Sequence, residues 1–292
     1  MVSPVIASMS FAGLGFLIAG IAVARGDLAA ARGLERLVVL GPTLFAASLA
    51  AFGAEHLSAA KGISQVVPRW IPGHYFWVYA VGLALLAAAL SLVIRRHMAL
   101  TAGLLGAMFL IFVGTIHLPN VVMNPNNRIL WAVMLRDTSF AAGALTLAAS
   151  EIAAALRTLR SGLVSVGRVL FGLPILAFGV EHFLHPEFAP GVPLAKITPE
   201  WLPFRFFCAE VVGAVLLVAG FSVLLNKWSR FSAAMVGLAM VVLTLGLYLP
   251  ILLMAHGTAA RVEGMNYVFD TLLFGGAALL VAGAMPERAP GK

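Results

Sequence analysis

The stretch Phe-Gly-Ala-Glu-His at residues 52–56 decides the fold, because it returns as Phe-Gly-Val-Glu-His at residues 178–182. Each copy is followed by a Trp-X-Pro motif, at 70–72 and at 201–203. The Glu-His pairs are 126 residues apart and the Trp-X-Pro motifs 131, so the connection after the second pair is five residues longer. Leu-Pro, Asp-Thr and Gly-Ala pairs continue the correspondence further along the chain. An internal repeat of this length predicts a duplicated architecture.

The composition is that of a membrane protein. Apolar residues make up 61% of the 292 residues and charged residues only 11%, with a mean hydropathy of +1.00. Water cannot satisfy so apolar a surface, so we expect the bilayer to be the solvent for most of the chain. The net charge of +7 does not predict nucleic-acid binding, because Lys and Arg lie at the ends of apolar runs. The single cysteine, Cys208, excludes a disulfide, a Cys-X-X-Cys pair and a thiolate metal site within one chain.

The apolar runs predict an all-α protein with nine transmembrane helices. The first run lacks a basic leader and is about 20 residues long, enough to span the bilayer, so we expect a retained helix rather than a signal peptide. This extra helix and its basic connection (1–35) precede two four-helix units, 36–160 and 161–292, the second ending in a short disordered tail. The nine helices are expected at 4–25, 36–56, 72–94, 98–118, 135–156, 163–184, 202–225, 229–253 and 266–285.

The distribution of Lys and Arg predicts the orientation. Each unit has an even number of helices, so both units enter the membrane from the same side and should be parallel repeats, related by a pseudo-twofold axis along the membrane normal. The connections on one side hold twelve of the 19 Lys and Arg residues, against seven in the longer loops of the other side. The positive-inside rule places the richer side in the cytoplasm of a bacterial-type inner membrane. The N-terminus and all the repeated motifs then lie outside, and the C-terminus inside.

The two Glu-His pairs are the first candidates for chemistry. Glu55-His56 and Glu181-His182 end the second and sixth helices on the outer side, where ionisable groups are costly and usually face protein or a water-filled cavity. One hypothesis is a catalytic site between the units, in which carboxylate and imidazole exchange protons or bind a quinone carbonyl, with His185 extending the second pair. The structural alternative is that each His complements a helix dipole and each Glu pairs with a loop Arg. No metal site is predicted, because the first copy lacks a counterpart of His185.

Asp137 and Asp270 are expected to open the fifth and ninth helices. An Asp at that place caps free backbone N–H groups, which favours a structural role. Each also follows several apolar residues, which indicates a position inside the edge of the bilayer and a need for a partner. A role in proton handling is therefore the alternative. The cations and hydrogen-bonding groups available in the two copies are Arg136, Arg128 and His117, then Arg205 and Arg261.

Four further residues complete the predicted ligand-binding set. Arg205 and Glu210 lie in the seventh helix, and Glu210 is expected about two turns into the membrane, either neutral or paired with a cation. Arg205 at i,i+5 is a poor partner, and Arg168 on another helix is one option. His117 and Tyr248 precede the two Leu-Pro pairs, so both are placed to hydrogen-bond a head group or a quinone carbonyl, although both are also common interfacial residues.

The pattern resembles the DoxX-like membrane proteins. A four-helix apolar unit, Phe-Gly-X-Glu-His at the end of its first helix, and short basic hairpins on the other side carry the resemblance over 36–156 and 163–285. This resemblance implies a membrane subunit associated with quinone-linked sulfur oxidation or with other redox or thiol-stress assemblies. It carries over no catalytic residue, and two fused units after an extra helix depart from the usual single unit. The matching positions are Gly53, Glu55, His56, Gly179, Glu181 and His182.

These observations predict a redox-associated membrane subunit. It would bind a quinone or a similar small amphipathic ligand near the outer face, between the units, and would meet the lipid bilayer and an extracytoplasmic or membrane redox partner. A transporter is one alternative, although the cytoplasmic halves of the helices are almost wholly apolar. The other is a noncatalytic scaffold that holds an extracytoplasmic partner by its outer loops. The sequence contains no Gly-X-Gly-X-X-Gly nucleotide loop, Walker loop or His-Glu-X-X-His motif in a suitable context.

Overall fold

The computed structural model describes residues 3–286, and over that range the regular structure is helical. The strand-like feature in these residues is an isolated antiparallel bridge between Phe188 and Ile197. From residue 287 on, the predicted disordered tail lies outside the described residues. Eight helical segments are long and apolar enough to cross a membrane, as expected for a multi-pass all-α membrane protein: Pro4–Ala30, Glu35–Ser58, His74–Val93, Met98–Met123, Ala154–Leu184, Arg205–Leu224, Ser229–Leu253 and Thr258–Ala284.

One further long helix, α7 (Arg128–Glu151), corresponds to the helix expected at 135–156. It has 24 residues but is not among the eight apolar segments. Arg136 and Asp137 lie inside it rather than at its start, and they lower its mean hydropathy. Its C-terminal half is nevertheless largely buried against the other helices.

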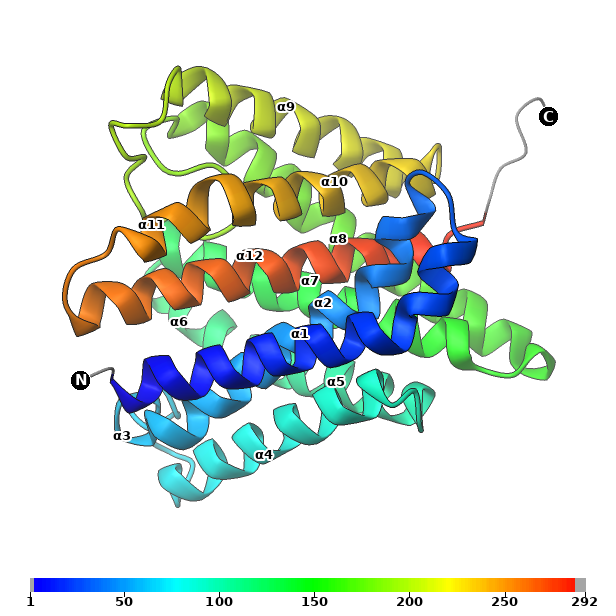
Figure 1. Ribbon diagram of the computed structural model, residues 1–292, viewed down its shortest axis with the longest axis horizontal. Helices are drawn as coiled ribbons and strands as arrows, with labels where there is room; N and C mark the ends of the chain where they lie inside the picture. Colours follow the sequence, from blue (N-terminus) through cyan, green and yellow to red (C-terminus); the bar gives the residue numbers. More distant parts are fainter. Residues whose placement is uncertain (1–2, 287–292) are drawn as a thin grey trace.

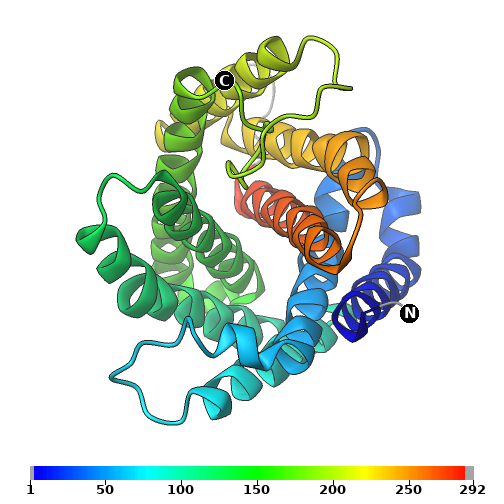
Figure 2. The same ribbon diagram turned by 90° about the vertical axis from the view of Figure 1, so that its left-hand side faces the viewer.

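The helices form one bundle with the long loops at one end. The start of α1 and the loop 185–204 lie at that end, and the short turns and the end of α12 lie at the other (Figure 1). Figure 2 shows α12 in the middle, surrounded by the other long helices. The long helices are α1 (Pro4–Ala30), α2 (Glu35–Ser58), α4 (His74–Val93), α5 (Met98–Phe112), α7, α8 (Arg157–Leu184), α9 (Arg205–Leu224), α10 (Ser229–Leu243) and α12 (Thr258–Ala284); α3 (Ala60–Ile63) is a single turn.

Several local features occur in pairs. The helices α5 and α10 each continue into a π-helical turn, Val113–His117 and Thr244–Tyr248, followed by the short helices α6 (Leu118–Met123) and α11 (Leu249–Leu253). Each π turn precedes a Leu-Pro pair, and proline cannot donate the next helical hydrogen bond, which favours a locally widened helix. The turns 94–97 and 225–228 correspond as well, because each contains two residues with positive φ.

The helix pairs within and between the predicted units also correspond. The helix α2 packs on α4 as α8 packs on α9, and α5 packs on α7 as α10 packs on α12. Between the units, α12 packs on α2 and α7 packs on α8, and α7 and α12 contact each other directly. Their close approach depends on glycine: a Cβ on Gly143 would lie 2.7 Å from the Cα of Ala277, and one on Gly276 would lie 2.7 Å from the Phe45 backbone nitrogen.

The centre of the bundle is aromatic. Phe274 of α12 lies with its ring centroid 5.6 Å from that of Phe171 and 5.8 Å from that of Phe178, both on α8. Phe140 of α7 joins the same group at 6.4 Å. All four side chains are almost completely buried. These rings fill the middle of the bundle and separate the polar groups near the long loops from those near the short turns.

The helix α1 packs mainly on α2 and makes smaller contacts with α4 and α12. Its small residues receive side chains of α2 and α12: a Cβ on Gly20 would lie 2.5 Å from Thr43, and one on Gly13 would lie 2.3 Å from the Phe269 ring. Along α2 the contacting ridge continues through the fully buried Ala47. The corresponding residue of α8 is Leu173, which is 54% exposed. The second unit therefore presents bulky apolar side chains where the first presents small ones to α1.

Candidate functional site

The first Glu-His pair ends α2. A carboxylate oxygen of Glu55 accepts a hydrogen bond of 3.1 Å from the side-chain amide of Asn266, which lies on α12. The Nδ1 of His56 lies 2.8 Å from the carbonyl oxygen of Phe52, so this nitrogen carries the proton. The contact with α4 is close at this point, since a Cβ on Gly82 would lie 2.9 Å from the His56 Cβ. Glu55 is thus directed at α12, whereas His56 is held by its own helix.

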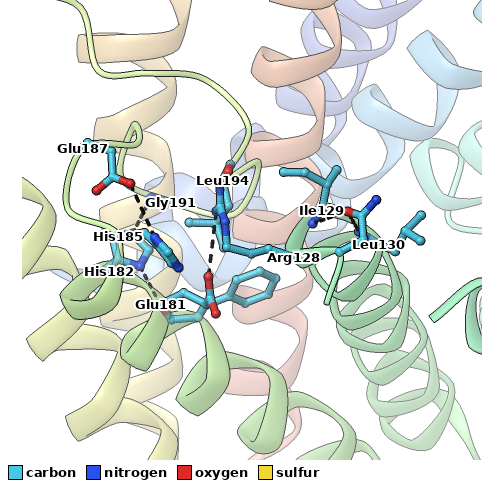
Figure 3. A network of polar contacts seen from close by, with 11 residues as sticks. Arg128, Ile129, Leu130, Glu181, His182, His185, Glu187, Gly191 and Leu194 are labelled. Atoms are coloured by element: carbon cyan, nitrogen blue, oxygen red, sulfur yellow. Dashed lines mark hydrogen bonds and ion pairs between the residues drawn. The ribbon is translucent and has the colours of Figure 1, made fainter. Parts of the chain in front are cut away.

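The second Glu-His pair has different surroundings (Figure 3). His182 is 1% exposed, its Nδ1 donates to the carbonyl oxygen of Phe178 at 2.6 Å, and its Nε2 accepts from the backbone N–H of Gly191 at 2.8 Å. Both ring nitrogens are therefore occupied, and the ring is a neutral imidazole. A carboxylate oxygen of Glu181 lies 3.8 Å from Arg128 Nη1. Glu181 therefore faces an arginine, at the start of α7, while the neutral His182 ring is held by backbone groups and adds no positive charge at the helix end.

His185, which was predicted to extend the second Glu-His pair, does not join Glu181 and His182 in one site. The His185 ring lies 3.4 Å from a carboxylate oxygen of Glu187, its neighbour in the following loop. In Figure 3 these two residues lie beside Glu181 and His182 without joining them around one point. No group of three or more His, Cys, Asp or Glu side chains that could hold a metal ion occurs within residues 3–286.

Asp137 and Asp270 do not cap helices, so that interpretation was wrong. The helix α7 begins at Arg128 and is capped by the side chain of Asn127, which accepts hydrogen bonds from two backbone N–H groups. The helix α12 begins at Thr258. Asp270 lies twelve residues later, about 18 Å along the helix axis. The two carboxylates are therefore inside the bundle, where they need partners.

Each buried Asp has one basic partner. Asp137 lies 2.8 Å from the Nε2 of His117, which the π turn after α5 presents to α7. Asp270 accepts from Arg136 Nη1 at 2.5 Å, so this second pair links α12 to α7. All four side chains are about one-seventh exposed. Asp270 is also within electrostatic range of Glu55 and Asp137, so the three carboxylates and the two basic groups form one polar cluster.

A cleft opens beside this cluster. Its volume is about 590 Å³, and it lies between α7, α12 and the loop 185–204. Its polar side chains are Arg136, Glu263, Asn266, Tyr267 and Asp270. Its apolar lining consists of Ile129, Val133, Pro193, Ala195, Ala259 and Val262. None of the four Glu-His residues lines it, and Glu55 approaches it through Asn266.

Two polar atoms at the cleft have no hydrogen-bond partner. The Nε of Arg136 and the Oδ1 of Asn266 are both buried and unpaired among the described residues. A buried donor or acceptor without a partner is costly, so such atoms mark places where a further molecule binds favourably. The carboxylate of Glu263, at the rim of the cleft, does have partners: it accepts a hydrogen bond of 2.8 Å from the Tyr267 hydroxyl and lies 3.7 Å from the Lys196 ammonium.

The loop 185–204 covers one side of the cleft and is fixed by the surrounding helices. Arg128 donates to the carbonyl oxygen of Leu194 at 2.6 Å and lies over the Phe188 ring at 3.9 Å (Figure 3). Leu194 has a positive φ of 51° and is buried, with Pro193 and Ala195 on either side facing the cleft. Tyr248, a predicted ligand-binding residue, donates to the carbonyl oxygen of Pro190 at 2.8 Å and is fully buried. Its hydroxyl therefore supports the loop.

Arg205 and Glu210 lie away from the cleft. Glu210 is exposed on α9 and makes no hydrogen bond or ion pair with any residue from 3 to 286. The expectation of a buried carboxylate was wrong, and Arg168, one option for its partner, does not pair with it. The reason is rotational: Ala209 and Gly213 face the neighbouring helix, and Glu210 points outward beside them. Arg205, at the start of α9, lies over the Phe206 ring at 5.0 Å.

Sequence reasoning missed three residues of the cleft, Glu263, Asn266 and Tyr267. Together with Asp270 they recur at i, i+3, i+4 and i+7, the spacing of one helix face. This spacing is present in the sequence, but the predicted helix began at residue 266 and left Glu263 outside it, so the shared face was not recognised. A helix that begins at Thr258 brings all four residues to the same face.

The comparisons with known proteins leave the function open. Residues 45–159 match a family model described as a domain of unknown function (DUF8561). This match covers less than half of the chain and falls within the first predicted unit, from inside α2 to the start of α8. No curated protein and no solved structure matches the chain. The resemblance to DoxX-like proteins stays a hypothesis.

Proposed function

We propose that this multi-pass membrane protein binds a quinone or a similar small amphipathic molecule in the outer cleft, as a redox-associated subunit. The observation that carries the proposal is the cleft itself, with an apolar lining around a buried Arg136–Asp270 pair and two unpaired polar atoms. A volume of about 590 Å³ is suitable for a small ligand. The redox association rests on the resemblance to DoxX-like proteins, and electron transfer would belong to a partner.

The chemistry of the cleft fits a quinone head group. A quinone carbonyl accepts hydrogen bonds, and Arg136 Nε is a buried donor with no acceptor. The Oδ1 of Asn266 would accept from a hydroxyl of the reduced form. Ile129, Val133 and Val262 would contact the ring and the start of an apolar tail. Glu55 would not contact the ligand itself but would orient Asn266, because it accepts a hydrogen bond from the Asn266 side-chain amide.

We further propose that the cleft lies between two duplicated units, in a nine-span protein with its long loops outside. The paired π turns, the paired positive-φ turns and the matching helix contacts support the duplication. The cleft then takes α7 from the first unit, and α12 and the loop 185–204 from the second. The aromatic core below it favours binding over permeation, because four buried phenyl rings fill the centre of the bundle.

The test is quinone binding by the purified full-length protein. A short-chain quinone is titrated in neutral detergent, and bound quinone is also extracted from the protein as isolated. Arg136→Gln is expected to weaken binding at least tenfold, because it removes a donor worth about 1.5–3 kcal/mol. Glu210→Gln is the matched control, since it changes an exposed carboxyl away from the cleft.

A second variant protects this test against misfolding. Val262→Trp fills the cleft from its apolar side and leaves the ion pair in place. It is expected to abolish binding while the protein elutes from size exclusion as the parent does. Quinone binding of parental strength in both Arg136→Gln and Val262→Trp would refute the assignment of the cleft.

A further inference from the structure

Arg168 is a charged side chain without a partner at the end of the molecule opposite the cleft. It lies in α8, and its Nε is buried with no hydrogen-bond acceptor. No carboxylate of the described residues forms an ion pair with it. The position that corresponds to it in α2 is Pro42, so this charge belongs to the second unit alone. A half-buried guanidinium with an unpaired nitrogen favours an anion from outside the chain.

Two more arginines share the helix face of Arg168. Arg157 and Arg160 lie eleven and eight residues before it, and at 100° per residue the three side chains fall within an arc of about 80°. Both are exposed and make no ion pair among residues 3–286. Helical side chains lean toward the N-terminus of their helix, so Arg168 is directed toward Arg160. We call Arg157, Arg160 and Arg168 the α8 arginine face.

The depth of Arg168 corresponds to the edge of a bilayer. It lies sixteen residues before Leu184, the last residue of α8, or about 24 Å along the axis. In a hydrocarbon core of roughly 30 Å, this places its Cα inside the hydrocarbon, within reach of the lipid phosphates on that side. Val166, Val169 and Leu173 are exposed large apolar residues of α8 at about the depth of Arg168 or deeper, where acyl chains would contact them.

We propose that the α8 arginine face binds the phosphate of an anionic phospholipid, with Arg168 as the central ligand. The side that carries the short basic connections is cytoplasmic by the positive-inside rule, and the cytoplasmic leaflet is rich in anionic lipids. Arg160 and Arg157 add positive potential above the phosphate, and the neighbouring apolar side chains receive the acyl chains. The carboxylate nearest to Arg157 along the chain, Glu151, is exposed at the end of α7 and makes no ion pair in the described part of the chain. This site is independent of the outer cleft.

Lipid titration of the full-length protein tests the proposal. The protein in neutral detergent is titrated with phosphatidylglycerol, and with phosphatidylcholine as the uncharged comparison, while bound lipid is counted by native mass spectrometry and thermal unfolding is followed. The parent is expected to retain phosphatidylglycerol and to unfold at a higher temperature with it. Arg168→Gln is expected to weaken retention about tenfold, and Arg168→Lys less.

The control is Arg96→Gln, which removes an exposed arginine from another connection on the same side. It is expected to bind phosphatidylglycerol as the parent does, and its folding is compared by size exclusion. Equal retention by Arg168→Gln and the parent would overturn the site. Equal protection by inorganic phosphate alone would also overturn it, because the ligand would then be a soluble anion. An equal loss in Arg96→Gln would replace a specific site by general attraction to basic loops.

Discussion

At the level of single residues, the two histidines of the repeated motif have diverged. His56 makes one hydrogen bond, to its own helix, and its ring is partly exposed. His182 is buried and uses both nitrogens, one for its helix and one for the loop at Gly191. The histidine of the first motif therefore bonds only to its own helix α2, whereas that of the second also fixes the loop that covers the cleft.

This difference predicts unequal effects of one substitution. His182→Ala leaves the N–H of Gly191 unpaired and opens a cavity, so we expect it to lower the free energy of unfolding by about 2–4 kcal/mol. His56→Ala, the matched change, is expected to cost about 1 kcal/mol or less. Thermal unfolding in detergent measures both. A larger loss in His56→Ala would show that His182 does not fix the loop.

At the level of elements, side-chain size on equivalent helices decides which face receives the extra helix. The ridge of α2 that runs through Thr43 and Ala47 fits the glycines of α1. The ridge of α8 carries Val169 and Leu173 at the same positions, both exposed. Small residues allow close helix contacts in membranes, whereas bulky apolar residues suit lipid. The sequence therefore selects one docking face out of two similar helices.

The second prediction concerns substitutions that change the side-chain size at the corresponding positions Ala47 of α2 and Leu173 of α8. Ala47→Leu inserts a bulky side chain into a fully buried position and is expected to destabilise the docking of α1 by about 1–3 kcal/mol. Leu173→Ala, at the exposed counterpart, is expected to change stability little. The measurement is disulfide crosslinking between cysteines placed at Ser8 and Ser58, whose hydroxyls lie 3.0 Å apart. Unchanged crosslinking in Ala47→Leu would contradict the role of the ridge.

At the level of the whole molecule, polarity is unequally distributed between the two ends. The long loops lie at one end of the bundle and the short turns at the other (Figure 1). The cleft and the polar cluster lie beside the loop 185–204, and the α8 arginine face lies in the half of α8 nearer the short turns. The centre between them is filled by apolar and aromatic side chains. Such a distribution favours a protein that binds separate ligands at its two faces.

The orientation is the third prediction. In a Cys208→Ala background, a cysteine at Gln65 is expected to react with a membrane-impermeant maleimide in intact cells, because the positive-inside rule predicts that the loop after α2 lies outside. A cysteine at Arg96 is expected to react only after the cells are permeabilised. Both positions are exposed, so access to the reagent is decided by the membrane. The reverse labelling pattern would place the cleft in the cytoplasm.

The sequence alone was sufficient for features that depend on the chain locally. Hydrophobic runs determine membrane helices because the bilayer requires every backbone group to be paired within a helix. The return of the Glu-His and Trp-X-Pro motifs indicated corresponding segments, and the paired π turns and hairpin turns lie in such segments. Helix starts were less predictable, since Trp131 to Leu135 and Met265 to Phe269 are apolar enough to suit either a loop at the interface or a first helical turn.

The partners of the polar groups were decided only by the tertiary structure. Arg136 pairs with Asp270 across two helices, whereas its neighbour Asp137 pairs with His117, and no spacing in the sequence distinguishes these choices. The pairing follows from how closely α7 and α12 approach at Gly143 and how each helix is rotated. The helix α9 is rotated so that Ala209, and not its neighbour Glu210, faces the bundle. The helix α12 begins eight residues before the predicted start, which brings Glu263 into the cleft. Rotation and contact are properties of the packed bundle, because each helix alone is equally stable in any orientation.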